Sequence, residues 1–211
     1  MELADLRREY QSHPFDVVDV DPDPYRQFAL WFAEVDEADG LETNAAVLAT
    51  AGADGRPSAR HVLVKGVDRS GFVFYTNYRS RKAAQMETNP HASLVFAWAP
   101  LNRQVIVEGR VSRINPEDSD AYFATRPRTS QLGAWASPQS QPVASRAVLD
   151  EAFADLETRY AGMTVPRPAH WGGYRVDPDR IEFWQGRANR MHDRLSYGRA
   201  GGGWRIERLA P

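Results

Sequence analysis

The sequence predicts an α+β domain built around a barrel-like antiparallel sheet with helices around it. Short stretches that alternate between apolar and polar residues are separated by tight-turn sequences such as Gly52-Ala53-Asp54-Gly55, which is typical of hairpins. Helical patterns interrupt these strands at irregular intervals. No Gly-x-Gly-x-x-Gly opens a helix after a strand, and no Gly-rich loop ends in Lys-Ser or Lys-Thr. These absences argue against a dinucleotide-binding βαβ unit and against a nucleotide triphosphatase.

The N-terminal part of the chain predicts an arm, a helix and the first strands. Residues 1–20 are polar without a strong period, so we expect an arm there and a single domain over residues 21–211. An Asp-Pro-Asp-Pro segment opens a helix, and Gly40 follows its end. The apolar face of that helix carries Phe28, Trp31, Phe32 and Val35. Three strands are then predicted at 45–50, 58–67 and 72–76.

The remaining elements follow from caps, breakers and periodicity. Ser80 is a suitable N-cap for a helix at 81–88, which Asn89-Pro90 stops. Asn115-Pro116 starts another helix that runs to about residue 125, and a loop is predicted at 126–144. A last helix at 145–160 has an apolar stripe typical of core packing. Further strands are predicted at 92–97, 104–114, 171–176, 181–184 and 204–209.

Bulk composition limits the class of protein. The net charge is −2, so the chain has no overall attraction to nucleic acid or membrane, and we expect neither as a partner. With no cysteine there is no disulfide, thiolate catalysis or Cys-ligated metal. No stretch approaches a membrane span, and the charged N-terminus has no apolar signal-peptide region. A cytoplasmic protein is therefore expected.

Positive charge is carried almost entirely by arginine, with 24 arginines against two lysines, Lys65 and Lys82. A lysine kept against that background suggests a site that needs a compact ammonium group rather than a planar guanidinium. Two leftover surface lysines would explain the counts equally well.

The first of three basic clusters combines Arg60 and Lys65 with Tyr75-Thr76 and with Ser80-Arg81-Lys82 at a helix start. Free N–H groups, the positive end of the helix dipole and two cations together favour a phosphate. The alternative is a capped helix with a solvated basic first turn.

The other two clusters leave their function open. Tyr122, Arg126, Arg128 and Ser130 surround a helix C-terminus, where cations also favour the dipole, so the sequence does not choose between a structural role and an anion site. In the third cluster, Arg190-Met191-His192-Asp193-Arg194 alternates along an extended segment. His192 is a candidate general acid or base, a ring-stacking partner or a structural histidine, and the spacing gives no metal-ligand set.

Several segments together resemble the pyridoxamine 5′-phosphate oxidases, over nearly the whole chain from about residue 6. They are Arg60-His61-Val62-Leu63-Val64-Lys65, Phe74-Tyr75-Thr76-Asn77, Ser80-Arg81-Lys82-Ala83, Arg103-Gln104-Val105, Arg126-Pro127-Arg128, Gln131-Leu132-Gly133-Ala134-Trp135-Ala136-Ser137, Trp171-Gly172-Gly173, Glu182-Phe183-Trp184-Gln185-Gly186 and Arg190-Met191-His192-Asp193-Arg194. The resemblance implies an FMN-binding split barrel that works as a homodimer with FMN at the subunit interface. His61 and Met191 depart from the aliphatic residue and the leucine usual at these positions, and both substitutions are mild.

The resemblance also implies roles for individual residues. FMN would be bound by Arg60, His61, Val62, Leu63, Val64, Lys65, Tyr75, Thr76, Arg81, Lys82, Gln104, Gln139, Ser140, Trp184 and Arg194. The substrate phosphate would meet Lys65, Tyr122, Arg126 and Ser130, with Arg190, Met191 and His192 against the pyridine ring and Arg7, Arg8, Glu9 and Tyr10 closing over the substrate. Arg190 and His192 would be the catalytic pair, and no metal is implied.

The implied reaction is the oxidation of pyridoxamine or pyridoxine 5′-phosphate to pyridoxal 5′-phosphate, with O2 as acceptor and H2O2 as product. Another split-barrel flavoprotein, such as a phenazine-pathway oxidase or a deazaflavin-using reductase, would keep the flavin residues without needing Lys65, Tyr122, Arg126 and Ser130 together. A flavin- or pyridoxal-phosphate-binding carrier without turnover, and a pyridoxal-phosphate enzyme with Lys65 as Schiff base, are further alternatives.

Overall fold

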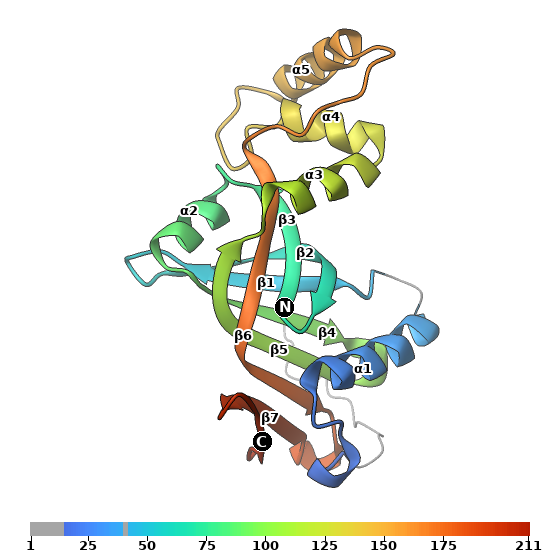
Figure 1. Cartoon of the computed structure of the whole chain (residues 1–211), viewed down its shortest axis with the longest axis vertical. Helices are drawn as coiled ribbons and strands as arrows, with labels where there is room; N and C mark the ends of the chain where they lie inside the picture. The colour runs from blue at the N-terminus through green and yellow to red at the C-terminus, as the bar shows by residue number, and fades with distance from the viewer. Residues whose placement is uncertain (1–14, 40–41) are drawn as a thin grey trace, which may run out of the picture.

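The computed structural model describes residues 15–39 and 42–211, and an antiparallel sheet forms the centre of this part of the chain (Figure 1). Its strands are β1 (Ala45–Ala51), β2 (Pro57–Asp68), β3 (Gly71–Asn77), β4 (His91–Trp98), β5 (Arg103–Arg113), β6 (Trp171–Gln185), β7 (Asp193–Ala200) and β8 (Gly203–Arg208). The helices are α1 (Pro24–Asp39), α2 (Arg81–Thr88), α3 (Pro116–Thr125), α4 (Arg128–Ala136) and α5 (Arg146–Arg159). Short 3-10 helices lie at Val17–Asp19, Ala99–Leu101 and Ala188–Arg190.

Six of the strands close into a barrel. The strand order is β3-β2-β1-β4-β5-β6-β7-β8, and an additional pairing joins β3 to β6. The first part of β6 pairs with β3 from Trp171 to Val176, and its last part pairs with β7 from Arg180 to Gln185, while β5 runs along most of its length. β7 and β8 therefore extend the sheet beyond the closed barrel, and the predicted α+β barrel is confirmed.

Three elements differ from the sequence prediction. β6 is one strand where two were predicted, because Pro178 is accommodated at a register shift opposite Gly109. The predicted loop 126–144 contains α4, whose start lacks a side-chain cap and whose interior includes Gly133, so its local pattern is weak. β7 was missed beyond Arg194, although Leu195 and Tyr197 are fully buried.

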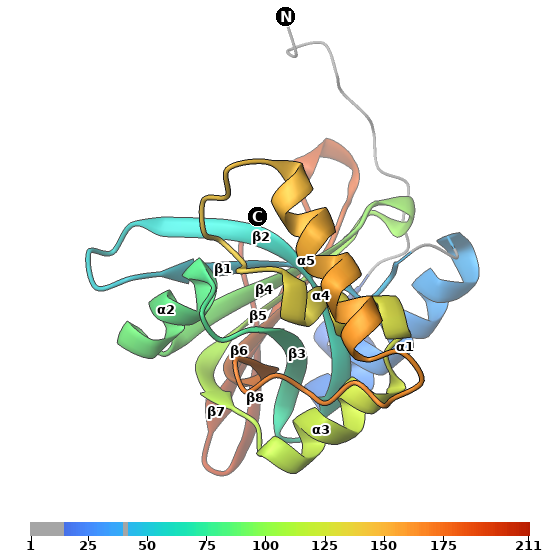
Figure 2. The same ribbon diagram turned by 90° about the horizontal axis from the view of Figure 1, so that it is seen from above.

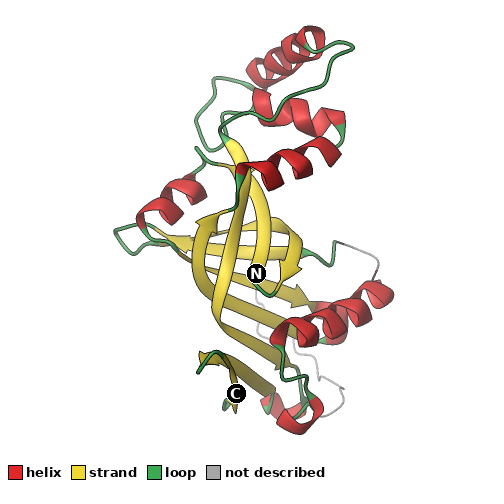
Figure 3. Ribbon diagram, in the orientation of Figure 1, coloured by secondary structure: helices red, strands yellow, loops and turns green. Residues whose placement is uncertain are grey.

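Aromatic side chains fill the barrel and fix α1 against it. Figure 3 shows the strands at the centre with the helices around them. The Phe28 ring of α1 lies 5.1 Å from the Phe72 ring and 5.0 Å from the Phe96 ring, in edge-to-face geometry. Phe15 also belongs to this core, since its ring lies 4.8 Å from that of Trp31, although the sequence places it in the arm.

A second, smaller core fixes the helices at one end of the barrel. Phe123 of α3, Leu132 of α4 and Tyr160 after α5 pack with Trp171, the first residue of β6. Figure 1 shows α3, α4 and α5 gathered at this end, and Figure 2 shows α2 and α1 on opposite sides of the molecule. The helices α3, α4 and α5 thus cover the barrel end at which β3 and β6 meet.

A substitution at Gly109 would test how closely β5 packs against β6. A Cβ at this position would lie 2.0 Å from the Asp177 carbonyl oxygen, which is backbone and cannot move aside cheaply. We expect Gly109→Ala to lower the free energy of unfolding by about 1–3 kcal/mol through overpacking. Gly198→Ala in β7 is the matched control, because nothing lies within 4 Å of its added Cβ. Chemical denaturation measures the free energy of unfolding of each variant. Equal values for Gly109→Ala and Gly198→Ala would contradict the expectation.

Candidate active site

Two adjoining cavities lie where β2 and β3 meet the helices. The first, cavity A, has a volume of about 420 Å³ and is lined by Leu63, Lys65, Tyr75, Thr76, Asn77, Tyr122, Arg126, Ser130, Gly133, Ala134, Ser137, Gln139 and Trp171. The second, cavity B, has a volume of about 470 Å³ and is lined by Ser58, Ala59, Arg60, His61, Val62, Tyr75, Thr76, Arg81, Lys82, Gln139 and Ser140. Tyr75, Thr76 and Gln139 line both, so they form the wall between the cavities.

Lys82 is a buried cation at the start of α2, beside cavity B. Its Nζ donates to Thr76 Oγ1 at 3.0 Å, to Gln139 Oε1 at 3.3 Å and to Ser80 Oγ at 3.4 Å. Ser80 is the N-cap of the helix, as predicted, and accepts from the Ala83 backbone N–H. Burial, followed by the nearby charge of Arg60, lowers the pKa of Lys82 to about 8. The protein therefore holds this ammonium group where its charge is poorly compensated.

Arg60 adds a second cation to cavity B. Its guanidinium donates to the Leu48 carbonyl oxygen at 3.0 Å and to the hydroxyls of Thr50 and Ser58, each at 2.6 Å. These partners are neutral, and burial with the nearby Arg81 charge lowers the pKa of Arg60.

No carboxylate of the described residues forms an ion pair with any of the three cations of cavity B, which are Arg60, Arg81 and Lys82. Together with the free N–H groups at the start of α2, this donor set fits a phosphate group.

Arg126 contributes a half-buried guanidinium to cavity A. It follows α3 directly and lies over the Trp171 ring in a cation–π contact, with its Cζ 4.5 Å from the ring centroid. Its Nη1 atom is buried without a hydrogen-bond partner, and desolvation lowers the pKa of the group. A buried donor without a partner is costly, so the side chain is suited to an anionic ligand.

Lys65 lines cavity A together with Leu63, at a point where β2 is irregular. The pairing of β2 with β3 shifts register between Val64 and Gly66, which leaves Lys65 as the extra residue of a bulge. Val64, just before the bulge, is buried in the barrel core and lines neither cavity.

A stack of aromatic rings lines cavity A. The Tyr75 and Tyr122 rings lie 3.9 Å apart at 16°, and the Tyr75 and Trp171 rings lie 5.4 Å apart at 11°. These contacts hold β3, α3 and β6 in fixed relation. Burial is the main cause that raises the pKa of both tyrosines, which keeps their hydroxyls neutral donors.

The remaining predicted site residues lie on the strands β5, β6 and β7 and in the connection between β6 and β7. Gln104 faces Trp184 across β5 and β6, and Trp184 faces Arg194 across β6 and β7, so the three form one row. The Arg194 side chain is paired with Glu182, through Nε to Oε1 at 2.7 Å and Nη2 to Oε2 at 3.1 Å. The His192 ring lies 4.6 Å from that of Trp184. None of the residues Gln104, Trp184, Arg190, Met191, His192 and Arg194 lines cavity A or cavity B.

The cavities also contain residues that the sequence did not assign to a site. These are Ser58, Ala59, Asn77, Gly133, Ala134, Ser137 and Trp171. Four of them lie in the segments 131–137 and 171–173, which carried the family resemblance and could have identified them. The predicted residues Arg7, Arg8, Glu9 and Tyr10 lie outside the described residues.

The described residues contain neither a candidate membrane-spanning helix nor a candidate metal site. No helix in this part of the chain is long and apolar enough to cross a membrane. Residues 15–39 and 42–211 also contain no group of three or more His, Cys, Asp or Glu side chains that could hold a metal ion.

Comparison with protein families gives two matches that together span most of the chain. A family model described as pyridoxamine 5′-phosphate oxidase matches residues 35–160, and one described as the pyridoxine 5′-phosphate oxidase C-terminal dimerisation region matches residues 171–211. A pyridoxine/pyridoxamine 5′-phosphate oxidase of Rubrobacter xylanophilus is 60% identical over 100% of this chain and 97% of its own length. The enzyme of the same description from Paraburkholderia phymatum is 56% identical over 99% of each chain.

Solved structures show the same fold. PhzG from Burkholderia lata, in complex with tetrahydrophenazine-1-carboxylic acid, has a TM-score of 0.89 at 30% identity, over 95% of this chain and 99% of its own. A pyridoxamine 5′-phosphate oxidase-related, FMN-binding protein from Nostoc punctiforme has a TM-score of 0.71 at 18% identity, over 89% of this chain and 98% of its own, and shows likeness of fold alone.

Proposed function

The chain belongs to the pyridoxamine 5′-phosphate oxidase family, and from this membership we propose that it oxidises pyridoxamine or pyridoxine 5′-phosphate to pyridoxal 5′-phosphate with FMN, O2 being reduced to H2O2. The observation that carries the proposal is the pair of adjoining cavities, each with cations that lack a carboxylate partner among the described residues. Both the cofactor and the substrate have a phosphate and a flat ring, so two neighbouring anion sites suit them. A cytoplasmic location stays a prediction from the sequence.

In this proposal cavity B binds FMN. Arg60, Arg81 and Lys82 hold the cofactor phosphate at the start of α2, and Thr76 and Gln139, which already contact Lys82, complete its polar wall. When bound, FMN supplies the acceptor for two electrons from the substrate carbon and passes them to O2. The task of the protein is then to bind, orient and shield the two rings.

Cavity A binds the substrate phosphate in the same proposal. The unpartnered Nη1 of Arg126 donates to it, and Lys65, Tyr122 and Ser130 line the same space. Each hydrogen bond to a charged group contributes about 1.5–3 kcal/mol, so three or four of them anchor one end of a small substrate firmly. A substrate fixed by its phosphate keeps its ring in a constant position relative to the flavin, which is a precondition for fast transfer.

A second copy of the chain is proposed to complete the site. The row of Gln104, Trp184 and Arg194 lies away from both cavities, yet the family resemblance assigns these residues to the same cofactor. Half-buried Val47, Val95 and Ile106 lie side by side across β1, β4 and β5, giving an apolar outer face. A homodimer that covers this face would bring one protomer's row to its partner's cavity B, and the matched dimerisation region supports such a dimer.

Arg190 and His192 are proposed to orient the pyridine ring and to stabilise charge at the reacting carbon. The His192 Nδ1 accepts a hydrogen bond from the Arg187 backbone N–H at 3.1 Å. In the neutral imidazole this contact places the proton on Nε2. A near-total loss of turnover in His192→Asn with unchanged substrate affinity would contradict this orienting role and indicate obligatory proton transfer.

The proposal is tested with the purified protein. We expect a yellow protein with a flavin absorption spectrum after incubation with FMN, and release of H2O2 when pyridoxine 5′-phosphate is added in air. A protein that stays colourless would overturn the cofactor assignment. A yellow protein that releases no peroxide with either phosphorylated substrate would instead indicate a flavin carrier.

A phenazine-type substrate is the second candidate, because PhzG shares 30% identity and nearly the whole fold with this chain. Identity of 60% to a pyridoxine/pyridoxamine 5′-phosphate oxidase favours the vitamin B6 substrate. The four predicted phosphate residues also meet in one cavity, as an oxidase of phosphorylated pyridines requires. Turnover of tetrahydrophenazine-1-carboxylic acid in place of pyridoxine 5′-phosphate would reverse the assignment.

FMN affinity is expected to fall as the pH rises above about 8. The pKa of Lys82 is lowered to about 8 without a ligand, and a bound phosphate raises it by stabilising the charged form. Binding therefore takes up a proton above that pH, and the association constant decreases by at most about tenfold per pH unit. Fluorescence titrations of FMN between pH 7 and 9.5 measure the slope. Lys82→Met should remove this dependence of FMN affinity on pH. An FMN affinity that does not change with pH in the unmodified protein would contradict the expectation.

A further inference from the structure

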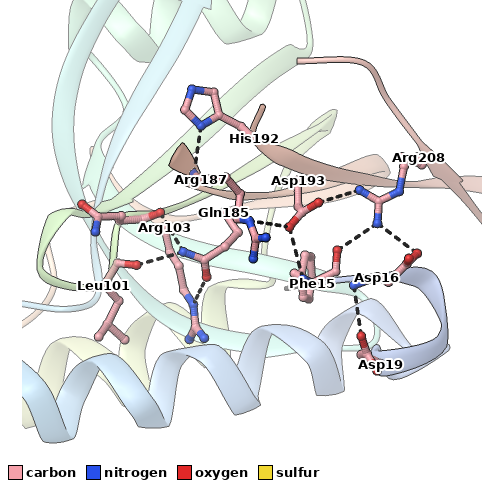
Figure 4. Close-up of polar contacts among 11 residues, drawn as sticks. Phe15, Asp16, Asp19, Leu101, Arg103, Gln185, Arg187, His192, Asp193 and Arg208 are labelled. Atoms are coloured by element: carbon pink, nitrogen blue, oxygen red, sulfur yellow. Dashed lines mark hydrogen bonds and ion pairs between the residues drawn. The ribbon is translucent and has the colours of Figure 1, made fainter. Parts of the chain in front are cut away.

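The loop that carries Arg190 and His192 is closed at its base by Asp193 (Figure 4). Residues 186–192 connect β6 to β7, and Gln185 and Asp193 are the last pair of the two strands before the loop. Arg187 joins both ends of the loop, since its N–H donates to His192 Nδ1 at 3.1 Å and its Nε lies 3.6 Å from Asp193 Oδ2. The position of the His192 imidazole thus depends, through Arg187, on Asp193, the next residue in the sequence.

The loop needs such a restraint because its backbone is strained. Asn189 has a φ of 55° and Arg190 a φ of 59°, so two successive residues other than glycine occupy the left-handed region. This conformation persists only where the surroundings hold it in place. The contacts of Arg187 with His192 and Asp193 restrain the base of this loop.

The same carboxylate anchors the first described residues of the chain. Asp193 Oδ2 accepts from the Phe15 N–H at 3.2 Å, and Asp193 Oδ1 accepts from Arg208 Nη1 at 2.7 Å. Arg208 Nη2 in turn donates to the Phe15 carbonyl oxygen at 3.0 Å and lies 2.9 Å from Asp16 Oδ1. The Asp193 side chain is only 17% exposed, so solvent screens these contacts weakly. Figure 4 shows Phe15, Asp193 and Arg208 joined in one cluster, with Arg187 on the other side of Asp193.

We propose that Asp193, held by Arg208, is a positioning residue that fixes the Arg190–His192 loop and the Phe15 end of the N-terminal segment relative to each other. This inference rests on the proposed function, because the loop matters for turnover only if Arg190 and His192 contact the substrate. Asp193 acts through its neighbours and not on the substrate. Its loss lets the loop relax from its strained conformation and frees the Phe15 amide.

Asp193→Asn tests the proposal, since it keeps the shape of the side chain and removes its charge. We expect kcat to fall about tenfold or more, because small displacements of orienting groups have effects of that size. The KM for pyridoxine 5′-phosphate and the Kd for FMN should stay within about threefold, since both phosphates bind in cavities A and B. Hydrogen exchange of the Phe15 amide should become faster, and this readout is independent of activity.

Asp177→Asn is the matched control. Asp177 also pairs with an arginine of β7, Arg199, at 3.2 Å, but it lies far from the loop in the strand register. The Asp177→Asn variant should change neither kcat nor the rate of hydrogen exchange at the Phe15 amide. Unchanged kcat in Asp193→Asn would overturn the proposal even if Phe15 exchanged faster, and so would a loss of kcat that merely follows a loss of FMN. Failure of the proposed function itself would show in the unmodified protein, as absent FMN binding or absent turnover.

Discussion

Arg126→Met is expected to raise the KM for pyridoxine 5′-phosphate by about a hundredfold while leaving the Kd for FMN nearly unchanged. The variant keeps a long apolar side chain over Trp171 but removes the charged donor whose Nη1 has no partner in the protein. Loss of one or two charge-assisted hydrogen bonds of about 1.5–3 kcal/mol each accounts for an effect of this size. Steady-state kinetics and FMN titration measure the two constants separately. The variant should also lose most of its preference for phosphorylated over unphosphorylated pyridoxine.

Arg128→Met provides the control for Arg126→Met. Arg128 lies two residues further on but donates to the carbonyl oxygens of Tyr160 and Met163, away from cavity A. It should lower the stability of the helical end of the barrel and leave the substrate KM unaffected. Equal effects of Arg126→Met on substrate and on FMN would contradict separate anchors for the two phosphates.

Lys82→Met is expected to weaken FMN binding by about ten- to hundredfold without destabilising the protein in the absence of the cofactor. The charged donor lies at the start of α2 among neutral partners, so its removal takes one charge-assisted contact from the cofactor phosphate. The depressed pKa shows that folding disfavours the charged form of Lys82. The unfolded chain therefore binds the proton more tightly, and a charged Lys82 opposes folding of the protein without ligand most strongly below about pH 8.

Thermal unfolding with and without FMN checks this pair of effects. Without FMN the melting temperature of Lys82→Met at pH 7 should equal or exceed that of the unmodified protein, and the rise caused by added FMN should be smaller. Arg79→Met, an exposed residue before the same helix, is the control for charge alone. A variant that unfolds at lower temperature without FMN, or that binds FMN normally, would argue against a phosphate site at Lys82.

The sequence alone predicted those features of the site that depend on residues close together in the chain. Ser80 and Lys82 lie within one cap and first turn, where the meaning of a residue depends on its immediate neighbours. The cluster around Arg126 could not be interpreted locally, because its significance comes from Trp171, which is 45 positions away and meets it only after β6 closes the barrel. The family resemblance supplied what periodicity did not.

The helix α4 and the row of Gln104, Trp184 and Arg194 show two further limits of local reasoning. Without a side-chain cap, α4 is held mainly by burying Leu132 against its neighbours, a tertiary effect. The row exists because of strand register across three strands, which alternation along one strand does not reveal. In the proposed homodimer these residues serve the partner's site, so the sequence of one protomer gives no geometric basis for assigning them.

Because β6 belongs both to the barrel and to the region that matches the dimerisation model, that region does not fold as a separate domain. That region begins at Trp171, the residue that opens β6, and the segment up to Val176 seals the barrel against β3. A protein truncated before Trp171 would leave two long strand edges, on β3 and β5, open to any other chain that could add a strand. Premature termination anywhere upstream of this point should therefore yield insoluble aggregates rather than a stable monomeric flavoprotein.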